Sequence, residues 1–228
     1  MSADFDAETG LLVASEAAVA ALRAGAEATP DGWAELEAAG AVTGGVPHPA
    51  LRPALEAMRS PVCGLDLQRG DRRGSGWVDG QVAAMVLPEP DGRRKLVDVP
   101  TPFLPAALAR MNELGPRPRI EPAVRLRFDV SELLELLARR RDTRHRPEPE
   151  GAAVATLLSG LREHWRAEAR WPPAPDSPGR RVVEVIDTEA GLWLVVPDEP
   201  TVELWPTTPT DVWMQLAGLL PRDEELAT

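Results

Sequence analysis

Residues 182–221 read VVEVIDTEAGLWLVVPDEPTVELWPTTPTDVWMQLAGLLP and contain three short apolar runs followed by a proline-rich turn. Each run has the length of a buried strand, and turn-forming residues separate the runs. After the turn PTTP, apolar residues recur at helical spacing as far as Leu220. The stretch therefore predicts three consecutive strands and a closing helix. The apolar runs are 182–186, 192–196 and 202–205.

The same order of motifs occurs earlier in the chain. The first set begins with a VLP turn and continues with an apolar run, a PTP turn and a helix that ends in LGPR. The later set has VVP, an apolar run, PTTP and a helix that ends in LLPR, in the same order. The first set occupies 86–117 and the second 195–222, an offset close to half the chain length. This offset is far longer than any solenoid repeat, so it indicates a duplicated half-molecule.

The duplication predicts an α+β fold with two pseudo-symmetric halves, each ordered as helix, three strands and helix. Three strands cannot cover both faces of a sheet, so we expect the halves to pair across a pseudo-two-fold axis and to share one central sheet, with a helical lobe from each. The N-terminal half is 1–120, with helices, three strands and a helix. The C-terminal half is 121–228, with two helices, three strands and a helix, and together they form one compact body.

Capping residues and apolar periods assign the elements of the first half. Ser15 begins one helix, Thr29-Pro30 begins a second that Gly40 ends, and a third follows the turn at His48. A helical stripe precedes the LGPR motif. The expected strands are 63–67, 82–87 and 96–99, the glycine-rich loop is 70–76, and the last helix is 103–114.

Two helices are expected before the strands of the second half. Residues 124–128 predict a short strand, and four leucines between Leu133 and Leu137 predict the first helix. The second helix rests on apolar residues at positions i, i+3, i+4, i+7 and i+11. These are Val154, Leu157, Leu158, Leu161 and Trp165.

Composition bounds the class of protein. The chain has 228 residues, 43% of them hydrophobic, which suffices for a folded core. Its 25 basic and 36 acidic residues give a net charge of -11, which argues against nucleic acid as a partner. No apolar run approaches the roughly 18 residues of a membrane span, and the acidic N-terminus does not resemble a secretory signal. The single cysteine cannot form a disulfide within the chain, which fits a reducing compartment. We therefore predict a cytoplasmic protein without membrane insertion.

Candidate catalytic groups are few. The three histidines, His48, His145 and His164, have no partner at i, i+4 spacing. Cys63 alternates with leucines on one strand face, which is typical of a packed thiol. We therefore predict no metal site, no cofactor and no catalytic residue, and a protein that is not an enzyme.

Two further motifs have structural interpretations. Asp187-Thr188-Glu189 lacks the glycine of an aspartic-protease signature and is better explained as a hairpin turn closed by Gly191. The segment QRGDRRGSG at 68–76 contains glycines and arginines, but its spacing matches neither phosphate-binding fingerprint. We interpret this segment as a flexible loop between strands.

Residues 182–221 resemble the last part of the EspG family, the ESX (type VII) secretion-associated chaperones of actinobacteria. In that family a strand ending in Asp-x-x-x-Gly precedes a hairpin, and a Pro/Thr-rich turn leads into the final helix. The region 80–114 is similar to the family's N-terminal repeat. The residues at the matching places are Asp187, Gly191, Thr207, Thr208, Asp211 and Leu216.

The resemblance implies a non-enzymatic cytosolic chaperone or adaptor. Its partner would be a helical secreted protein or heterodimer, PE-PPE-like or WxG-like, held before export. Seven tryptophans against three phenylalanines fit such a role, because tryptophan is a frequent anchor of protein interfaces. We expect the contact on the sheet face and the second helical lobe. The residues expected to bind the partner are Leu161, Trp165, Trp171, Trp193 and Trp205.

Two alternatives from other classes stay open at this point. One is a regulatory or DNA-associated module that uses the N-terminal helices, with the loop 69–73 as a wing. The other is a small-molecule enzyme with a cleft between the halves, which requires carboxylates with raised pKa values. The sequence leaves the oligomeric state open.

Overall fold

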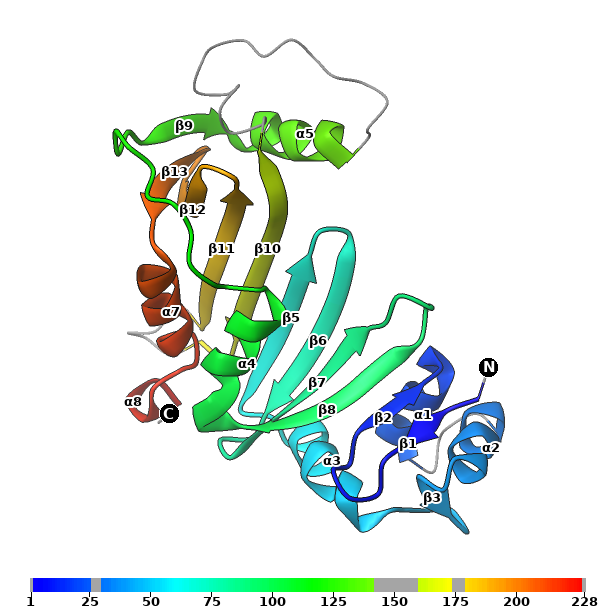
Figure 1. The fold of residues 1–228 in the computed structure, drawn as a ribbon. Helices are drawn as coiled ribbons and strands as arrows, with labels where there is room; N and C mark the ends of the chain where they lie inside the picture. The colour runs from blue at the N-terminus through cyan, green and yellow to red at the C-terminus, as the bar shows by residue number, and fades with distance from the viewer. Residues whose placement is uncertain (1, 26–29, 142–159, 174–178, 227–228) are drawn as a thin grey trace.

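An antiparallel sheet of eleven strands runs through the chain in the computed structural model, which describes residues 2–25, 30–141, 160–173 and 179–226 (Figure 1). The spatial order of its strands is β1, β2, β8, β7, β6, β5, β10, β11, β12, β13 and β9. Early in the chain these are β1 (Asp4–Phe5), β2 (Leu12–Ala14), β5 (Cys63–Arg69), β6 (Arg72–Val78), β7 (Val82–Pro88) and β8 (Arg94–Pro100). Later come β9 (Leu126–Asp129), β10 (Leu161–Arg170), β11 (Arg180–Thr188), β12 (Gly191–Asp198) and β13 (Thr201–Thr207), while β3 (Val42–Thr43) and β4 (Val46–Pro47) form a separate pair.

The two halves of the chain meet at the antiparallel pair β5–β10. In its register Leu67 lies opposite Ala167 and Leu65 lies opposite Ala169. From this pair the strands follow in chain order outward, β5 to β8 on one side and β10 to β13 on the other. The α+β class and the one sheet shared by both halves are therefore as the sequence predicts.

Each half contributes four strands to this central region, not the expected three. Most of the residues assigned to a glycine-rich loop belong to β6, which pairs with β5 along its whole length and with β7 from Ser75 to Val78. Gly74 and Gly76 lie on one face of β6, where a Cβ at Gly74 would come within 3.0 Å of the Val86 carbonyl oxygen. The glycines here mark close packing within a sheet, which sequence patterns do not separate from a loop.

The helix expected to contain Leu161 and Trp165 is also wrong, because these residues begin strand β10. From His164 to Arg170, small or aromatic residues that contact the core alternate with charged ones, which is the period of a strand. The other members of the expected helical stripe, Val154, Leu157 and Leu158, lie outside the described residues.

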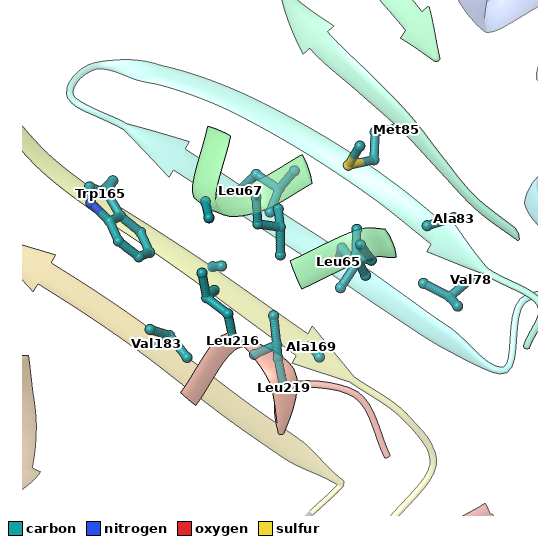
Figure 2. Close-up of a cluster of buried hydrophobic side chains, with 14 of the residues drawn as sticks. Leu65, Leu67, Val78, Ala83, Met85, Trp165, Ala169, Val183, Leu216 and Leu219 are labelled. Carbon is teal, nitrogen blue, oxygen red and sulfur yellow. The ribbon is translucent and has the colours of Figure 1, made fainter. Parts of the chain in front are cut away.

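Helices α4 (Leu104–Met111) and α7 (Pro209–Ala217) lie on one face of the sheet, with α8 (Asp223–Leu226) beside α7 (Figure 1). They cover the joint between the halves. Figure 2 shows Leu216 and Leu219 beside Ala169 and Val183 of the C-terminal half, and the same cluster reaches across to Leu65 and the rest of the N-terminal strands. This shared core fixes the two halves to each other.

The opposite face is covered at its two ends by different lobes. At the β7–β8 end, an N-terminal lobe buries Leu96 and Val86 against its helices. At the β12–β13 end, Trp193 and Leu204 pack against α5 (Val130–Arg141), which crosses the ends of the strands (Figure 1). The helices of the N-terminal lobe are α1 (Glu16–Ala24), α2 (Pro30–Ala38) and α3 (Arg52–Arg59).

The helix starts agree with the capping residues of the sequence. The Ser15 hydroxyl accepts a hydrogen bond from the backbone nitrogen of Ala18 at 3.1 Å, and α2 begins at Pro30. Before α7, Thr208 and Asp211 form a reciprocal capping box. Short 3-10 turns at Pro49–Leu51 and Thr101–Phe103 lead into α3 and α4.

Candidate interaction surfaces

The five residues expected to bind a partner do not lie together on one surface. Trp165 and Trp171 belong to the core beneath α4 and α7, whereas Trp193 and Leu161 belong to the cluster beneath α5. The side chains of Trp165, Trp171 and Trp193 are at most 5% exposed. These three rings are buried because their strands are covered on the faces where the rings lie. Their contact with a partner stays a prediction.

Trp205 lies half-buried on β13, on the face opposite to Val202 and Leu204, as the alternation of the strand predicts. Its indole Nε1 donates a hydrogen bond to a Glu203 carboxylate oxygen at 2.8 Å. The guanidinium of Arg125 lies 3.8 Å from the ring centroid, which is stacking distance. One face of this ring is thus covered by a solvated side chain that a partner could displace.

The Asp-x-x-x-Gly motif holds the segment that joins the two halves. Arg117 donates hydrogen bonds to both carboxylate oxygens of Asp187, at 2.9 Å from Nε and 2.7 Å from Nη2. Gly191 has a φ of +141°, and a Cβ there would lie 2.6 Å from the Pro118 carbonyl oxygen. The hairpin turn is confirmed, and its aspartate and glycine have a structural role in seating the linker.

A network of charged side chains occupies the middle of the sheet face opposite to α4 and α7. Glu168 is 2% exposed, and its carboxylate is bound by the guanidinium groups of Arg166, Arg170 and Arg180. Burial alone would raise the pKa of Glu168, but the hydrogen bond from Arg170 and the charges of the other arginines outweigh it and lower the pKa.

His164 lies at the end of this network and is nearly buried. Its Nε2 lies 2.8 Å from a Glu184 carboxylate oxygen. Within the described residues, no group of three or more His, Cys, Asp or Glu side chains has the geometry of a metal site. Cys63 is buried beside Leu65, and this burial raises the pKa of its thiol to about 11. His48 caps a 3-10 turn, and His145 lies outside the described residues.

A cleft of about 300 Å³ lies where the β5–β6 and β7–β8 hairpins meet the end of α4. Its lining includes Leu67, Leu87 and Met111, which are apolar, and the cations Arg72 and Lys95. The sequence analysis did not assign this site. Two signals were available, because Lys95 is the only lysine in the chain and Gly74 stands in an alternating strand position.

Arg69 anchors the wall of this cleft. Its guanidinium donates hydrogen bonds to the Met111 carbonyl oxygen at 2.6 Å, to Glu113 at 2.6 Å and to Glu163 at 3.1 Å. The end of α4 is thereby fixed to strand β5. Because both carboxylates neutralise Arg69, this residue adds little charge to the cleft.

Comparison with known proteins identifies the fold. No protein-family model matches the chain, and no curated protein matches its sequence. Among solved structures, one match is the Mycobacterium tuberculosis type VII secretion system chaperone EspG5, in a structure with the PE25–PPE41 dimer. The sequence identity is 15% and the TM-score 0.59, and the match covers 92% of this chain and 97% of that chain. The chain has an EspG-like fold.

The EspG-like fold bears out the resemblance carried by Asp187, Gly191 and the Thr207-Thr208 turn, and it extends that resemblance over nearly the whole chain. The solved neighbour is a chaperone. None of the described helices has the length and apolar character of a membrane span.

The two alternative functions gain no support from the geometry. In the DNA-associated alternative, the 69–73 wing would offer Arg69, Arg72 and Arg73 to phosphate, but two carboxylates hold Arg69 and the net charge of the chain is -11. The enzyme alternative requires raised carboxylate pKa values. Each described carboxylate with a resolved shift is shifted downward by hydrogen bonds or by nearby cations, namely Asp6, Asp91, Glu113 and Glu168.

Proposed function

We propose that this chain is a non-enzymatic cytosolic chaperone that holds a helical secreted protein or heterodimer, of the PE-PPE or WxG kind, until a type VII secretion machine takes it. The observation that carries the proposal is the EspG-like fold over 92% of the chain. A chaperone of this kind needs a rigid surface and no reactive groups. The antiparallel sheet with its shared core supplies that rigidity.

The proposal includes a pseudo-two-fold relation between the halves. The strand order supports it, because β5 to β8 and β10 to β13 proceed outward from one central antiparallel pair. Each series ends in a helix on the same face, α4 after β8 and α7 after β13. The duplicated turn motifs lie before these two helices.

For the partner surface, we propose the C-terminal half around α5 and β13. Helix α5 exposes Val130 and Leu134, at 42% and 58%, on the side away from the core. Leu161 packs in the cluster beneath this helix, whereas Trp205 lies on the opposite face of β13 under a displaceable arginine, so the proposed surface includes both faces of this end of the sheet. In this proposal the buried Trp165, Trp171 and Trp193 support the surface from below.

Coexpression tests the proposal directly. The tagged chain is produced with the small helical proteins encoded beside its gene, purified, and analysed by gel filtration with light scattering. We expect a defined complex with a helical protein or pair that survives gel filtration. If each helical candidate elutes separately while DNA or a metabolite binds the chain tightly, the chaperone role is refuted.

Matched variants locate the surface. We expect Leu134→Glu to weaken the complex by at least about ten-fold, because it places a charge in an apolar contact. Val46→Glu makes the same kind of change in the N-terminal lobe, where Val46 is 67% exposed, and should leave binding unchanged. Equal affinities of the two variants would contradict the proposed surface without contradicting the chaperone role.

A further inference from the structure

We propose that the cleft between the two N-terminal hairpins and the end of α4 binds an acidic peptide segment of a partner protein. The segment would insert one aliphatic side chain into the cleft and set carboxylates on its rim. This site lies on the N-terminal half, away from the α5 surface, and its binding of a peptide does not depend on the chaperone role.

The floor of the cleft is apolar and has room because of a glycine. Leu67 and Leu87 line it from adjacent parts of β5 and β7, and Met111 closes it from α4. A Cβ at Gly74 would lie 3.1 Å from Leu87 Cδ2 and 3.7 Å from the Leu67 Cβ, so any other residue would fill this floor. A volume of about 300 Å³ suits one or two side chains and is too small for a folded element.

The rim carries positive charge that the protein itself does not neutralise. No ion pair joins Arg72 or Lys95 to another of the described residues, whereas Arg69 and Arg166 are each paired with glutamates. Glu89 is the carboxylate on the rim. On a chain with a net charge of -11, two unpaired cations beside an apolar floor are complementary to an acidic partner.

A compact anion such as phosphate fits the cleft less well than a peptide does. Phosphate sites in proteins use converging backbone N–H groups or helix N-termini, whereas this cleft is bordered by the C-terminal end of α4. Its apolar floor would stay unfilled. The acidic end of this chain is engaged elsewhere, since Glu225 of α8 pairs with Arg181. An acidic segment of another protein could fill the apolar floor with one aliphatic side chain and pair its carboxylates with the cations of the rim.

Fluorescence anisotropy with a defined probe tests this inference. The probe is a labelled, alanine-based helical peptide with one leucine between two glutamates on the same face, and its control has glutamine in place of glutamate. We expect the full-length chain to bind the glutamate peptide at least about ten-fold more tightly than the glutamine peptide, with affinity falling as salt is added. Equal affinities for the two peptides would refute the charge recognition.

Three variants connect this binding to the cleft. Arg72→Glu with Lys95→Glu should weaken the glutamate peptide at least about ten-fold, and Glu89→Gln should strengthen it about three-fold. Gly74→Ala should weaken both peptides alike, because it fills the floor without changing charge. The control is Arg73→Glu, the same charge change on the opposite face of β6.

Two results would overturn the proposal. One is unchanged peptide affinity in Arg72→Glu with Lys95→Glu when the melting temperature matches that of the unaltered chain. The other is displacement of the peptide by millimolar inorganic phosphate at constant ionic strength, which would make the cleft a site for small anions. A chain that binds the peptide but captures no helical secreted protein would refute the chaperone role and leave this inference standing.

Discussion

The ion pair between Arg117 and Asp187 gives the sharpest test of how the two halves are joined. The pair seats the linker against β11, with side chains that are 15% and 7% exposed. A second pair, Arg127 with Asp198, has the same residue types and the same 2.7 Å Nη2–Oδ2 distance, but its side chains are 61% and 50% exposed. The two pairs therefore differ in burial, and also in geometry, because Arg117 binds both Asp187 oxygens whereas Arg127 binds Asp198 through Nη2 alone.

Burial decides the expected cost. Asp187→Ala leaves the Arg117 guanidinium nearly buried without its carboxylate, and breaking such a pair costs about 3 kcal/mol. Asp198→Ala leaves Arg127 in water, so the expected loss is below about 1 kcal/mol. In double-mutant cycles with Arg117→Ala and Arg127→Ala, we expect a coupling of about 2 kcal/mol for the buried pair and below about 0.5 kcal/mol for the exposed one.

Urea unfolding followed by tryptophan fluorescence supplies the free energies, since several of the seven tryptophans are buried. Limited trypsin digestion gives a local readout, because the Arg119–Ile120 bond becomes cleavable when the linker leaves the sheet, whereas Pro118 protects the bond after Arg117. If Asp187→Ala does not fold, the milder Asp187→Asn gives the same comparison at lower cost. Coupling energies that are equal for the two pairs would refute the reasoning from burial.

Three further predictions concern single groups. Native Cys63 should react with Ellman's reagent at pH 8 about a hundred-fold more slowly than the urea-unfolded chain, because burial raises its pKa to about 11. As pH rises, the Cys63 thiol loses its proton in the unfolded chain before it does in the folded chain. The free energy of unfolding should therefore also fall as pH rises above about 9. Glu168→Gln should lower the free energy of unfolding, measured with urea at pH 7, by about 3 kcal/mol. Below pH ~4.5 the variant should lose less stability than the wild type does, because only the wild type has a carboxylate of lowered pKa that becomes protonated there. Thr208→Ala should lower the free energy of unfolding, measured by calorimetry, by about 1 kcal/mol through loss of the α7 capping box, whereas Thr210→Ala, at an exposed position in the same first turn, should not.

Local signals in the sequence predicted most of the elements correctly. The apolar runs predicted strands β7, β12 and β13, and the capping residues Ser15, Pro30 and Thr208 predicted the starts of α1, α2 and α7. These signals act within a few residues of each other, so no knowledge of tertiary contacts was required.

Two of the missed strands show where local reasoning failed. β6 contains two glycines and three polar or charged residues, and its strand form depends on pairing with β5 and β7. β10 is the strand of the C-terminal half that pairs with the N-terminal half, and its charged side chains are stabilised by arginine–glutamate pairs within the strand and with β11. Both depend on neighbours distant in the chain, so their own residues carry a weak strand signal.

The candidate site was predicted less well than the fold. An alternating strand pattern indicates which tryptophans share a face, but it does not say whether a helix covers that face. Trp193 and Trp205 lie on opposite faces of adjacent strands, and α5 covers the first while only Arg125 covers the second. The cleft around Lys95 was missed because its lining comes from separate elements, among them β5, β6, β7, β8 and α4.

By itself the sequence determined the duplicated order of turns, strands and helices, the caps of the helices and the absence of a long apolar span, because each follows from spacing and chemistry within a short segment. The tertiary structure alone decided that β5 and β10 join the halves, which tryptophans are buried, and where unpaired cations meet an apolar floor. These features come from contacts between residues far apart in the chain, whose free energy depends on the packed neighbour and leaves no periodic pattern in the sequence.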